Sequence, residues 1–158
     1  MIKAGDKIPS VTLRQVTENG VQEVSSDQFF KGKRVALFAV PGAFTSTCSA
    51  KHLPSFVQNV DKLRGKGIDA VACTAVNDPA VMRAWGQQHK ADGIVMLSDG
   101  NGDFARALGL EADMTKHGMG RRSRRYSMLV DNGVVKNLNL EEPGAFGISG
   151  GDHMLTQL

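Results

Sequence analysis

Four short apolar runs mark out the chain. VALFAV (Val35–Val40) and IDAVACTAV (Ile68–Val76) are continuous and rich in β-branched residues, which is typical of strands buried on both faces. Ile94–Leu97 and Tyr126–Val130 predict two further strands. The sequence DNG (Asp131–Gly133) follows the last run and predicts a hairpin turn into one more strand, VVKNLNL.

The segments between these runs have the period of amphipathic helices. One predicted helical face, with apolar residues at spacings of three and four, comprises Leu53, Phe56, Val57, Val60 and Leu63. Pro54 falls inside this pattern and predicts a kink or local break. Asp78 and Pro79 are a typical N-cap and first position of a second helix. DFARALG predicts a short helix that ends at Gly109.

Strands that alternate with helices predict an α/β fold, with a central sheet flanked by helices. Such folds place ligand sites at the carboxyl ends of their strands. The 158 residues correspond to one domain, 1–158. Apolar residues make up 41% and charged residues 22% of the chain, as in ordinary globular proteins.

Charge and cysteine content narrow the functional classes. The formal net charge of +3 is too mild to indicate nucleic acid or membrane as a partner, and no segment is apolar enough to span a bilayer. The N-terminus shows no signal or transit pattern, so the two cysteines are expected to be reduced thiols in a cytoplasm. In RRSRR (Arg121–Arg125), without aromatic residues between the arginines, only Arg125 is expected to turn inward, and the other three to be solvated.

Two motifs suggest ligands but fit other interpretations better. GNGDFA (Gly100–Ala105) matches a dinucleotide fingerprint, yet it comes too late in the chain, so we expect a turn with Asp103 near a helix start and no NAD. Cys48 and His52 are four residues apart, but no second ligand pair accompanies them, so no metal is expected. His52 is expected to be a polar residue on the first helical turn, where it could lie close to the thiol.

Cys48 occupies a position that favours reactivity. The strand Val35–Val40 ends at Pro41, and a helix is expected to begin near Thr45–Cys48, with Thr45, Ser46 and Thr47 as possible N-caps. Backbone N–H groups and the helix dipole at such a site favour a thiolate, although a buried, inert cysteine is the alternative. TSTC has the spacing of a redox C-x-x-C motif with Thr45 in place of the first thiol, which rules out dithiol exchange at this turn.

Pro41, Thr45 and Cys48 form the pattern P-x-x-x-T-x-x-C, which resembles the active-site signature of the peroxiredoxins. The longer string VPGAFTSTCSAKHLPSF looks like the peroxiredoxin-5 branch, which includes the plant type II enzymes and their bacterial relatives. The similarity continues through VNDPAVMRAWGQ, LSDGNGDFARALGL and RSRRYSMLVDNGVV, and so covers nearly the whole chain. It implies a thioredoxin-like fold with a central mixed sheet flanked by helices.

The resemblance implies a thiol peroxidase that acts on hydrogen peroxide and small alkyl hydroperoxides. Cys48 would attack a peroxide oxygen and become a sulfenic acid. Thr45 would hydrogen-bond the bound peroxide, and Pro41 would pack over the thiolate. Arg125 would stabilise the thiolate and orient the peroxide. No prosthetic cofactor is implied, since a thiol reductant serves as co-substrate.

The resemblance leaves the route of re-reduction open. Some members of the branch use a cysteine near the C-terminus, where this chain reads AFGISGGDHMLTQL and has none. Plant type II enzymes carry a second cysteine at the spacing of Cys73, where a resolving role is possible. Because the strand around Cys73 reads as buried, we expect an external thiol, with glutathione and glutaredoxin ahead of thioredoxin. The resemblance also implies a homodimer, in which Phe44 and Trp85 are either core aromatics or part of the active-site mouth and dimer contact.

Two other functional classes share these residues. A peroxide sensor or relay would use the same chemistry at Cys48 and pass the oxidation to a partner protein. A non-catalytic binding module with a thioredoxin fold would need no reactive thiol, and the combination of Thr45, Cys48 and Arg125 argues against it.

Overall fold

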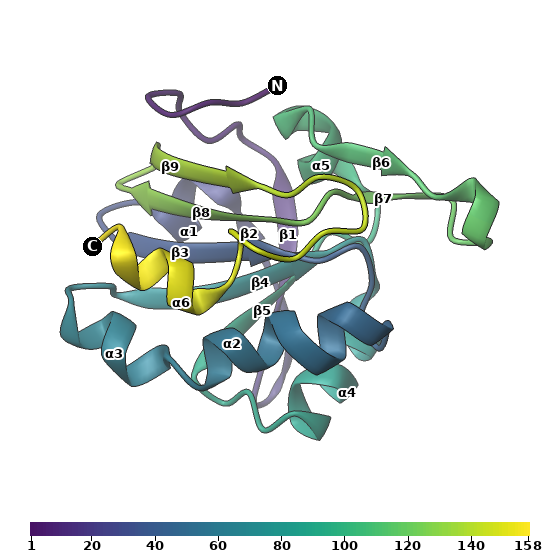
Figure 1. Ribbon diagram of the computed structural model, residues 1–158, viewed down its shortest axis with the longest axis horizontal. Coiled ribbons are helices and arrows are strands. Elements are labelled where there is room, and N and C mark those ends of the chain that lie inside the picture. The colour runs from purple at the N-terminus through teal and green to yellow at the C-terminus, as the bar shows by residue number, and fades with distance from the viewer.

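The computed structural model describes residues 1–158, which are arranged around one mixed sheet (Figure 1). Its strands are β1 (Thr12–Thr17), β2 (Gly20–Ser25), β3 (Arg34–Ala39), β4 (Ala70–Ala75), β5 (Ile94–Ser98), β8 (Tyr126–Asp131) and β9 (Val134–Leu140). They lie in the order β2-β1-β5-β4-β3-β8-β9. A separate two-stranded sheet, formed by β6 (Glu111–Asp113) and β7 (Arg121–Ser123), projects from one end of the molecule.

The strands predicted from the apolar runs form the centre of the sheet. β3, β4 and β5 are parallel, whereas β8 joins β3 and β1 joins β5 in antiparallel pairs. The central mixed sheet is therefore confirmed. The predicted hairpin between β8 and β9 is also confirmed, because Asn132 and Gly133 adopt the positive φ angles, 49° and 80°, of a type I′ turn.

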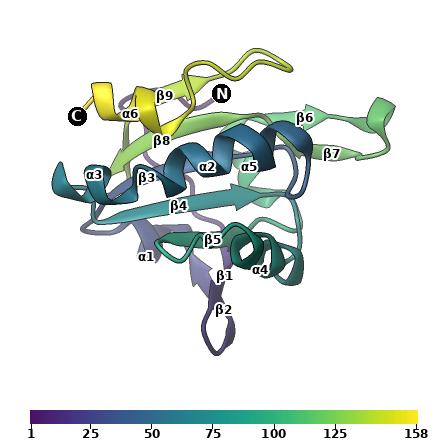
Figure 2. The ribbon, with the colours of Figure 1, turned by 60° about the horizontal axis from the view of Figure 1, so that its bottom comes forward.

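Side chains that alternate along the central strands separate the core into two layers. Phe38 and Cys73 face the layer beneath α2 (Leu53–Val57), α3 (Val60–Gly65), α4 (Pro79–Gln88) and α6 (Gly151–Thr156). Leu37 and Tyr126 face the other layer, which α1 (Ser26–Phe30) and α5 (Asp103–Leu108) cover. Figure 2 shows α2 and α4 on one side of the sheet and α1 on the other. Cys48 belongs to the same layer as Cys73.

The helix that carries Cys48 is locally widened. A π-helical turn, η1 (Cys48–His52), runs directly into α2, and the Leu53 N–H donates to the Cys48 carbonyl five residues earlier. Pro54 follows this turn, and its ring cannot sit against the carbonyl of Ala50 in a regular α-helix. The predicted disturbance at Pro54 thus takes the form of a wide turn before it. A second break at Gln58–Asn59 divides the predicted apolar face between α2 and α3.

The predicted N-cap of α4 and the predicted end of α5 are both confirmed. Asp78 Oδ1 accepts a hydrogen bond from Val81 N (2.9 Å), and α5 ends at Gly109 with φ 72°. GNGDFA is a turn, as expected, but the buried Asp99 caps α5 by accepting from the Phe104 and Ala105 N–H groups, both at 3.0 Å. The longest helix, α4, has ten residues, and no helix is long and apolar enough to cross a bilayer.

The prediction of three solvated arginines is wrong for two of them. Arg121 is exposed. Arg122 is half-buried and donates to the carbonyls of Met119 (2.9 Å) and Val76 (3.2 Å). Arg124 is also half-buried and donates to the Glu141 carbonyl (3.1 Å). Both guanidinium groups satisfy loop carbonyls that lack a partner in the sheet.

Candidate active site

Cys48 lies where the sequence placed it, in the first helical turn beyond the carboxyl end of β3. Its side chain is fully buried, with 0% exposure. The expected side-chain N-caps are absent, because Thr47 makes no capping bond and Thr45 Oγ1 donates to the Gly42 carbonyl at 2.7 Å. Since a carbonyl only accepts, the Thr45 proton is committed to Gly42, and its oxygen lone pairs remain for an O–H donor in the cleft.

Arg125 binds the Cys48 thiol directly. It lies between β7 and β8, and its Nη2 donates to Cys48 Sγ at 3.0 Å. The other terminal nitrogen, Nη1, is 2.8 Å from Nδ1 of His52. The predicted inward orientation of Arg125 is therefore confirmed. One guanidinium fork contacts the sulfur and the imidazole at once, which a single-point donor could not do.

His52 is a neutral ring in this arrangement. It is fully buried, packed against the rings of Phe38 and Phe146 with centroid distances of 5.0 and 5.1 Å. Burial, reinforced by the charge of Arg125, lowers the pKa of His52 to about 3. Its Nδ1 faces a donor and its Nε2 lies 2.9 Å from the Ser149 carbonyl, so the proton resides on Nε2.

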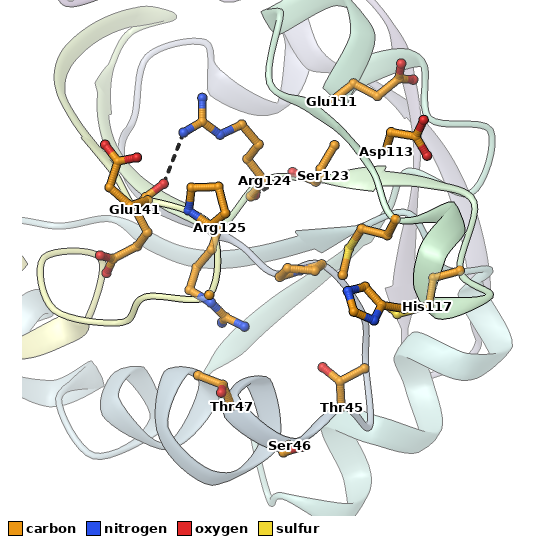
Figure 3. A pocket seen from close by; sticks show the side chains of 17 residues that line it. Thr45, Ser46, Thr47, Glu111, Asp113, His117, Ser123, Arg124, Arg125 and Glu141 are labelled. Atoms are coloured by element: carbon orange, nitrogen blue, oxygen red, sulfur yellow. Dashed lines mark hydrogen bonds between the residues drawn. The ribbon is translucent and has the colours of Figure 1, made fainter.

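A cleft of about 560 Å³, lined mostly by polar and charged residue types, opens above the thiol. Pro41, Thr45 and Arg125 all line it, so the fold brings together the residues that the sequence singled out. The two-stranded sheet β6–β7 and the turn between its strands form the opposite wall. There, Asp113 and His117 lie across from Thr45 (Figure 3). Cys48 itself does not line the cleft and lies buried beneath these residues.

Cys73 lies in the sheet rather than in the cleft. It is on β4, paired in register with Phe38 of β3, and its side chain has no exposed surface. Burial, with a smaller contribution from neighbouring Cys48, raises the pKa of the Cys73 thiol well above its usual range. Both cysteines are free. A thiol held in its neutral form is a poor nucleophile.

The two aromatic residues considered for the active-site mouth have different environments. Trp85 is fully buried, and its indole N–H donates to Ser49 Oγ, beside Cys48, at 3.0 Å. Phe44 is 48% exposed and has a positive φ of 67°, which is unusual for a residue other than glycine. Ala43 N donates to Asn77 Oδ1 at 2.9 Å and fixes this turn to the end of β4. Trp85 is thus a core residue, and only Phe44 lies at the surface.

Sequence reasoning missed the partners that hold Arg125 and His52. The spacing of Cys48 and His52 was the only available signal for the imidazole, and nothing local pointed to Ser149. No group of three or more His, Cys, Asp or Glu side chains gathers closely enough to hold a metal ion.

These features define a class of protein: a thioredoxin-like α/β fold with a buried cysteine that an arginine contacts at a strand-to-helix turn. The model of the Redoxin family matches residues 3–148 of the chain. Peroxiredoxin-2E of Arabidopsis thaliana chloroplasts is 49% identical over 99% of the chain and 69% of its own length. Peroxiredoxin-2B of the same plant is 42% identical over 99% of the chain and 98% of its own length.

Solved structures agree with these relatives. Reduced Prx3 from Vibrio vulnificus, in complex with hydrogen peroxide, superimposes with a TM-score of 0.96 at 46% identity, covering 99% of both chains. The chain belongs to the Redoxin family and, within it, to the peroxiredoxins of the plant type II and bacterial Prx5-like group. Its activity is that of a thiol-dependent peroxidase, and its thioredoxin-like fold is confirmed.

Proposed function

We propose that Cys48 is the cysteine that reduces peroxide and that Arg125 activates it. The observation that carries this assignment is the 3.0 Å contact from Arg125 Nη2 to Cys48 Sγ. The thiolate sulfur forms a bond to one peroxide oxygen, and the O–O bond breaks. The other oxygen leaves with the bonding electron pair and takes up a proton as water or alcohol. Cys48 is oxidised by two electrons to a sulfenic acid.

Thr45 and Pro41 complete the proposed peroxide site. The Thr45 hydroxyl donates to Gly42, so its lone pairs accept the O–H of an incoming peroxide. The remaining N–H donors of Arg125 stabilise the negative charge that develops on the leaving oxygen. Pro41 lines the cleft beside them and limits the access of water to the sulfur.

The proposed substrates are hydrogen peroxide and small alkyl hydroperoxides. The Vibrio vulnificus relative, whose structure contains hydrogen peroxide, is 46% identical to this chain. The thiol lies beneath the residues that line the cleft and has no exposed surface, so a slim O–O group reaches it more easily than a bulky one.

The proposed reductant is an external thiol, with glutathione and glutaredoxin ahead of thioredoxin, and no prosthetic cofactor takes part. Cys73 is a poor candidate for resolving the sulfenic acid, because it is buried in β4 and its pKa is raised by that burial. A disulfide also needs compatible Cβ directions, and the two thiols are held in different elements, Cys48 in η1 and Cys73 in β4.

We further propose that the protein acts as a homodimer in a cytoplasm. Phe44 precedes the active-site threonine and leaves 48% of its surface exposed, and Ile148 leaves 43% exposed, which supports a contact between copies near the site. Both cysteines are free thiols, which suits a reducing compartment. Light scattering at micromolar concentration tests the dimer, and a pure monomer would contradict it.

Steady-state consumption of hydrogen peroxide tests the proposed cycle. We expect turnover with glutathione and glutaredoxin, and its loss in Cys48→Ser. Turnover with thioredoxin alone would reassign the reductant. A single oxidation without turnover under any of these thiols would instead favour a sensor or relay, which the same Cys48 chemistry would serve.

A further inference from the structure

Glu141, directly after β9, is a buried carboxylate with an unusual set of partners. Only 5% of its surface is exposed. Its Oε2 accepts four hydrogen bonds, from the N–H groups of Gly147 (2.8 Å), Ile148 (2.9 Å) and Ser149 (2.8 Å) and from Ser149 Oγ (2.7 Å). No lysine, arginine or histidine side chain forms an ion pair with it. Successive backbone dipoles therefore hold the charge.

The same loop reaches the thiol through His52. The Ser149 carbonyl accepts from His52 Nε2 at 2.9 Å, and His52 Nδ1 lies 2.8 Å from Arg125 Nη1. Arg125 in turn donates to Cys48 Sγ at 3.0 Å. A continuous series of contacts thus links the Glu141 carboxylate to the reactive sulfur.

The backbone of Glu141 also forms hydrogen bonds with Arg124 and Arg125, in the segment between β7 and β8. Glu141 N donates to the Arg125 carbonyl (3.1 Å), and Arg124 Nη2 donates to the Glu141 carbonyl (3.1 Å). Figure 3 shows Glu141 beside Arg124 and Arg125, with this second bond drawn. Glu141 therefore contacts both the segment between β7 and β8 that carries Arg125 and the loop that binds its imidazole partner, His52.

We propose that Glu141 is a positioning residue for peroxide reduction. By holding Ser149 in place, it fixes the His52 ring as an acceptor at Nδ1, and His52 fixes the guanidinium of Arg125 against Cys48. The inference rests on the proposed roles of Arg125 and Cys48. Glu141 borders the same cleft, but its Oε2 is occupied by the donors of residues 147–149, through which it acts on Arg125.

An ionised carboxylate suits this role better than a neutral amide. Charge-assisted hydrogen bonds are about twice as strong as neutral ones, and here four donors converge on one oxygen. Burial opposes ionisation of Glu141, but these hydrogen bonds outweigh it and lower its pKa from the usual range. Glutamine at this position would keep the size and lose the charge.

The first test compares Glu141→Gln with Glu18→Gln. Glu18 is an exposed carboxylate in the turn between β1 and β2 and does not line the cleft, so its change removes the same charge without releasing the loop. Stopped-flow kinetics would measure the second-order rate of the reduced protein with hydrogen peroxide. We expect Glu141→Gln to slow it at least about tenfold, because misplacement of a reacting group by a remote change can cost up to ~100-fold. We expect less than about a twofold change for Glu18→Gln, as for a solvated charge.

A double-mutant cycle separates positioning from general loosening of the fold. If Glu141 acts through His52, Glu141→Gln has little further effect on the rate in a His52→Gln background. A wild-type rate in Glu141→Gln, or an equal slowing with and without His52, would overturn the inference. Arg125→Lys is measured in parallel: if it leaves the rate unchanged, the proposed role of Arg125 fails instead.

Two further measurements cover a Glu141→Gln variant that folds poorly. Ser149→Ala removes only the hydroxyl donor and leaves the three backbone donors, so we expect a smaller slowing in a stable protein. Nitrogen-15 NMR of the histidine rings would show a protected Nε2–H on His52 in the wild type and loss of that protection in Glu141→Gln. An unchanged His52 signal in a slowed Glu141→Gln variant would contradict the proposed route.

Discussion

At the scale of single residues, reactivity depends on how Arg125 is held. Its fork contacts the Cys48 sulfur at 3.0 Å and the neutral imidazole of His52 at 2.8 Å. An imidazolium could not accept a hydrogen bond from a guanidinium. The low pKa of His52 keeps the ring neutral, so that its Nδ1 can accept from Arg125. Cys48 differs from Cys73 in that a positively charged donor, Arg125, contacts its sulfur.

Arg125→Lys should slow the reaction with hydrogen peroxide on the order of 100-fold, the usual cost of removing one donor to a developing charge. Lysine keeps the positive charge but cannot reach the sulfur and His52 together. Stopped-flow kinetics under pseudo-first-order conditions would measure the rate. Arg121→Lys, at an exposed arginine of the same segment, is the matched control and should react like the wild type. Equal rates for both variants would contradict the role of Arg125.

His52 should make stability depend on pH. Its pKa is about 3 in the folded protein against 6.5 for the free side chain, so between these values the unfolded chain binds a proton that the folded protein does not. The free energy of unfolding therefore falls as pH falls, by about 2 kcal/mol from this residue between pH 7 and pH 5. Urea titrations across this range should show that His52→Gln lacks this loss. Parallel pH profiles for the two proteins would contradict the burial argument.

The sequence located the residues whose chemistry is local to a motif. Pro41, Thr45 and Cys48 share one turn, and the resemblance pointed to Arg125, which the fold brings to the same cleft. Ser149 could not be found in this way, because it meets His52 across 97 positions of sequence. Such contacts arise from tertiary packing and leave no local pattern.

At the scale of elements, burial decided which ones could be predicted. β3, β4, β5 and β8 are buried along most of their length, so each appears as a continuous apolar run. β1 and β2, towards one edge of the sheet, have mostly half-exposed or exposed residues and no such run, and they were missed. The three-residue strands β6 and β7 are too short to show a period.

Asp78→Ala should lower the free energy of unfolding by about 1 kcal/mol. The change removes the acceptor for Val81 N at the start of α4, and an N-cap of this kind typically contributes that much. Urea denaturation with unchanged m-values would measure it. Asp78→Asn keeps a capping oxygen and should remain close to the wild type. Equal losses in both variants would show that the charge, not the cap, matters.

At the scale of the whole molecule, the two thiols occupy different positions relative to the sheet. Cys48 lies at the carboxyl edge beneath the cleft, whereas Cys73 is inside the sheet, although both belong to one core layer. Cys73 enters this layer because every second side chain of β4 points to the same face of the sheet. Both thiols are fully buried, but only Cys48 lies directly beneath the residues that line the cleft.

Cys73→Ser should leave the turnover of hydrogen peroxide with glutathione and glutaredoxin within about twofold of the wild type, because a buried neutral thiol is a poor nucleophile. The expected cost is in stability instead, since the hydroxyl replaces an apolar sulfur in the core. A coupled assay of glutathione oxidation would measure the turnover. Loss of turnover in a folded Cys73→Ser protein would make Cys73 the resolving residue.

Cys48 is expected to be the one residue that takes an oxygen atom from peroxide. Intact mass measured after one equivalent of hydrogen peroxide, with and without a trap for sulfenic acid, tests this assignment. We expect a protein one oxygen heavier, with the trap attached at Cys48 and none at Cys73. A loss of two hydrogens would instead show a bond between Cys48 and Cys73. An unchanged mass while peroxide persists would contradict the assignment of Cys48.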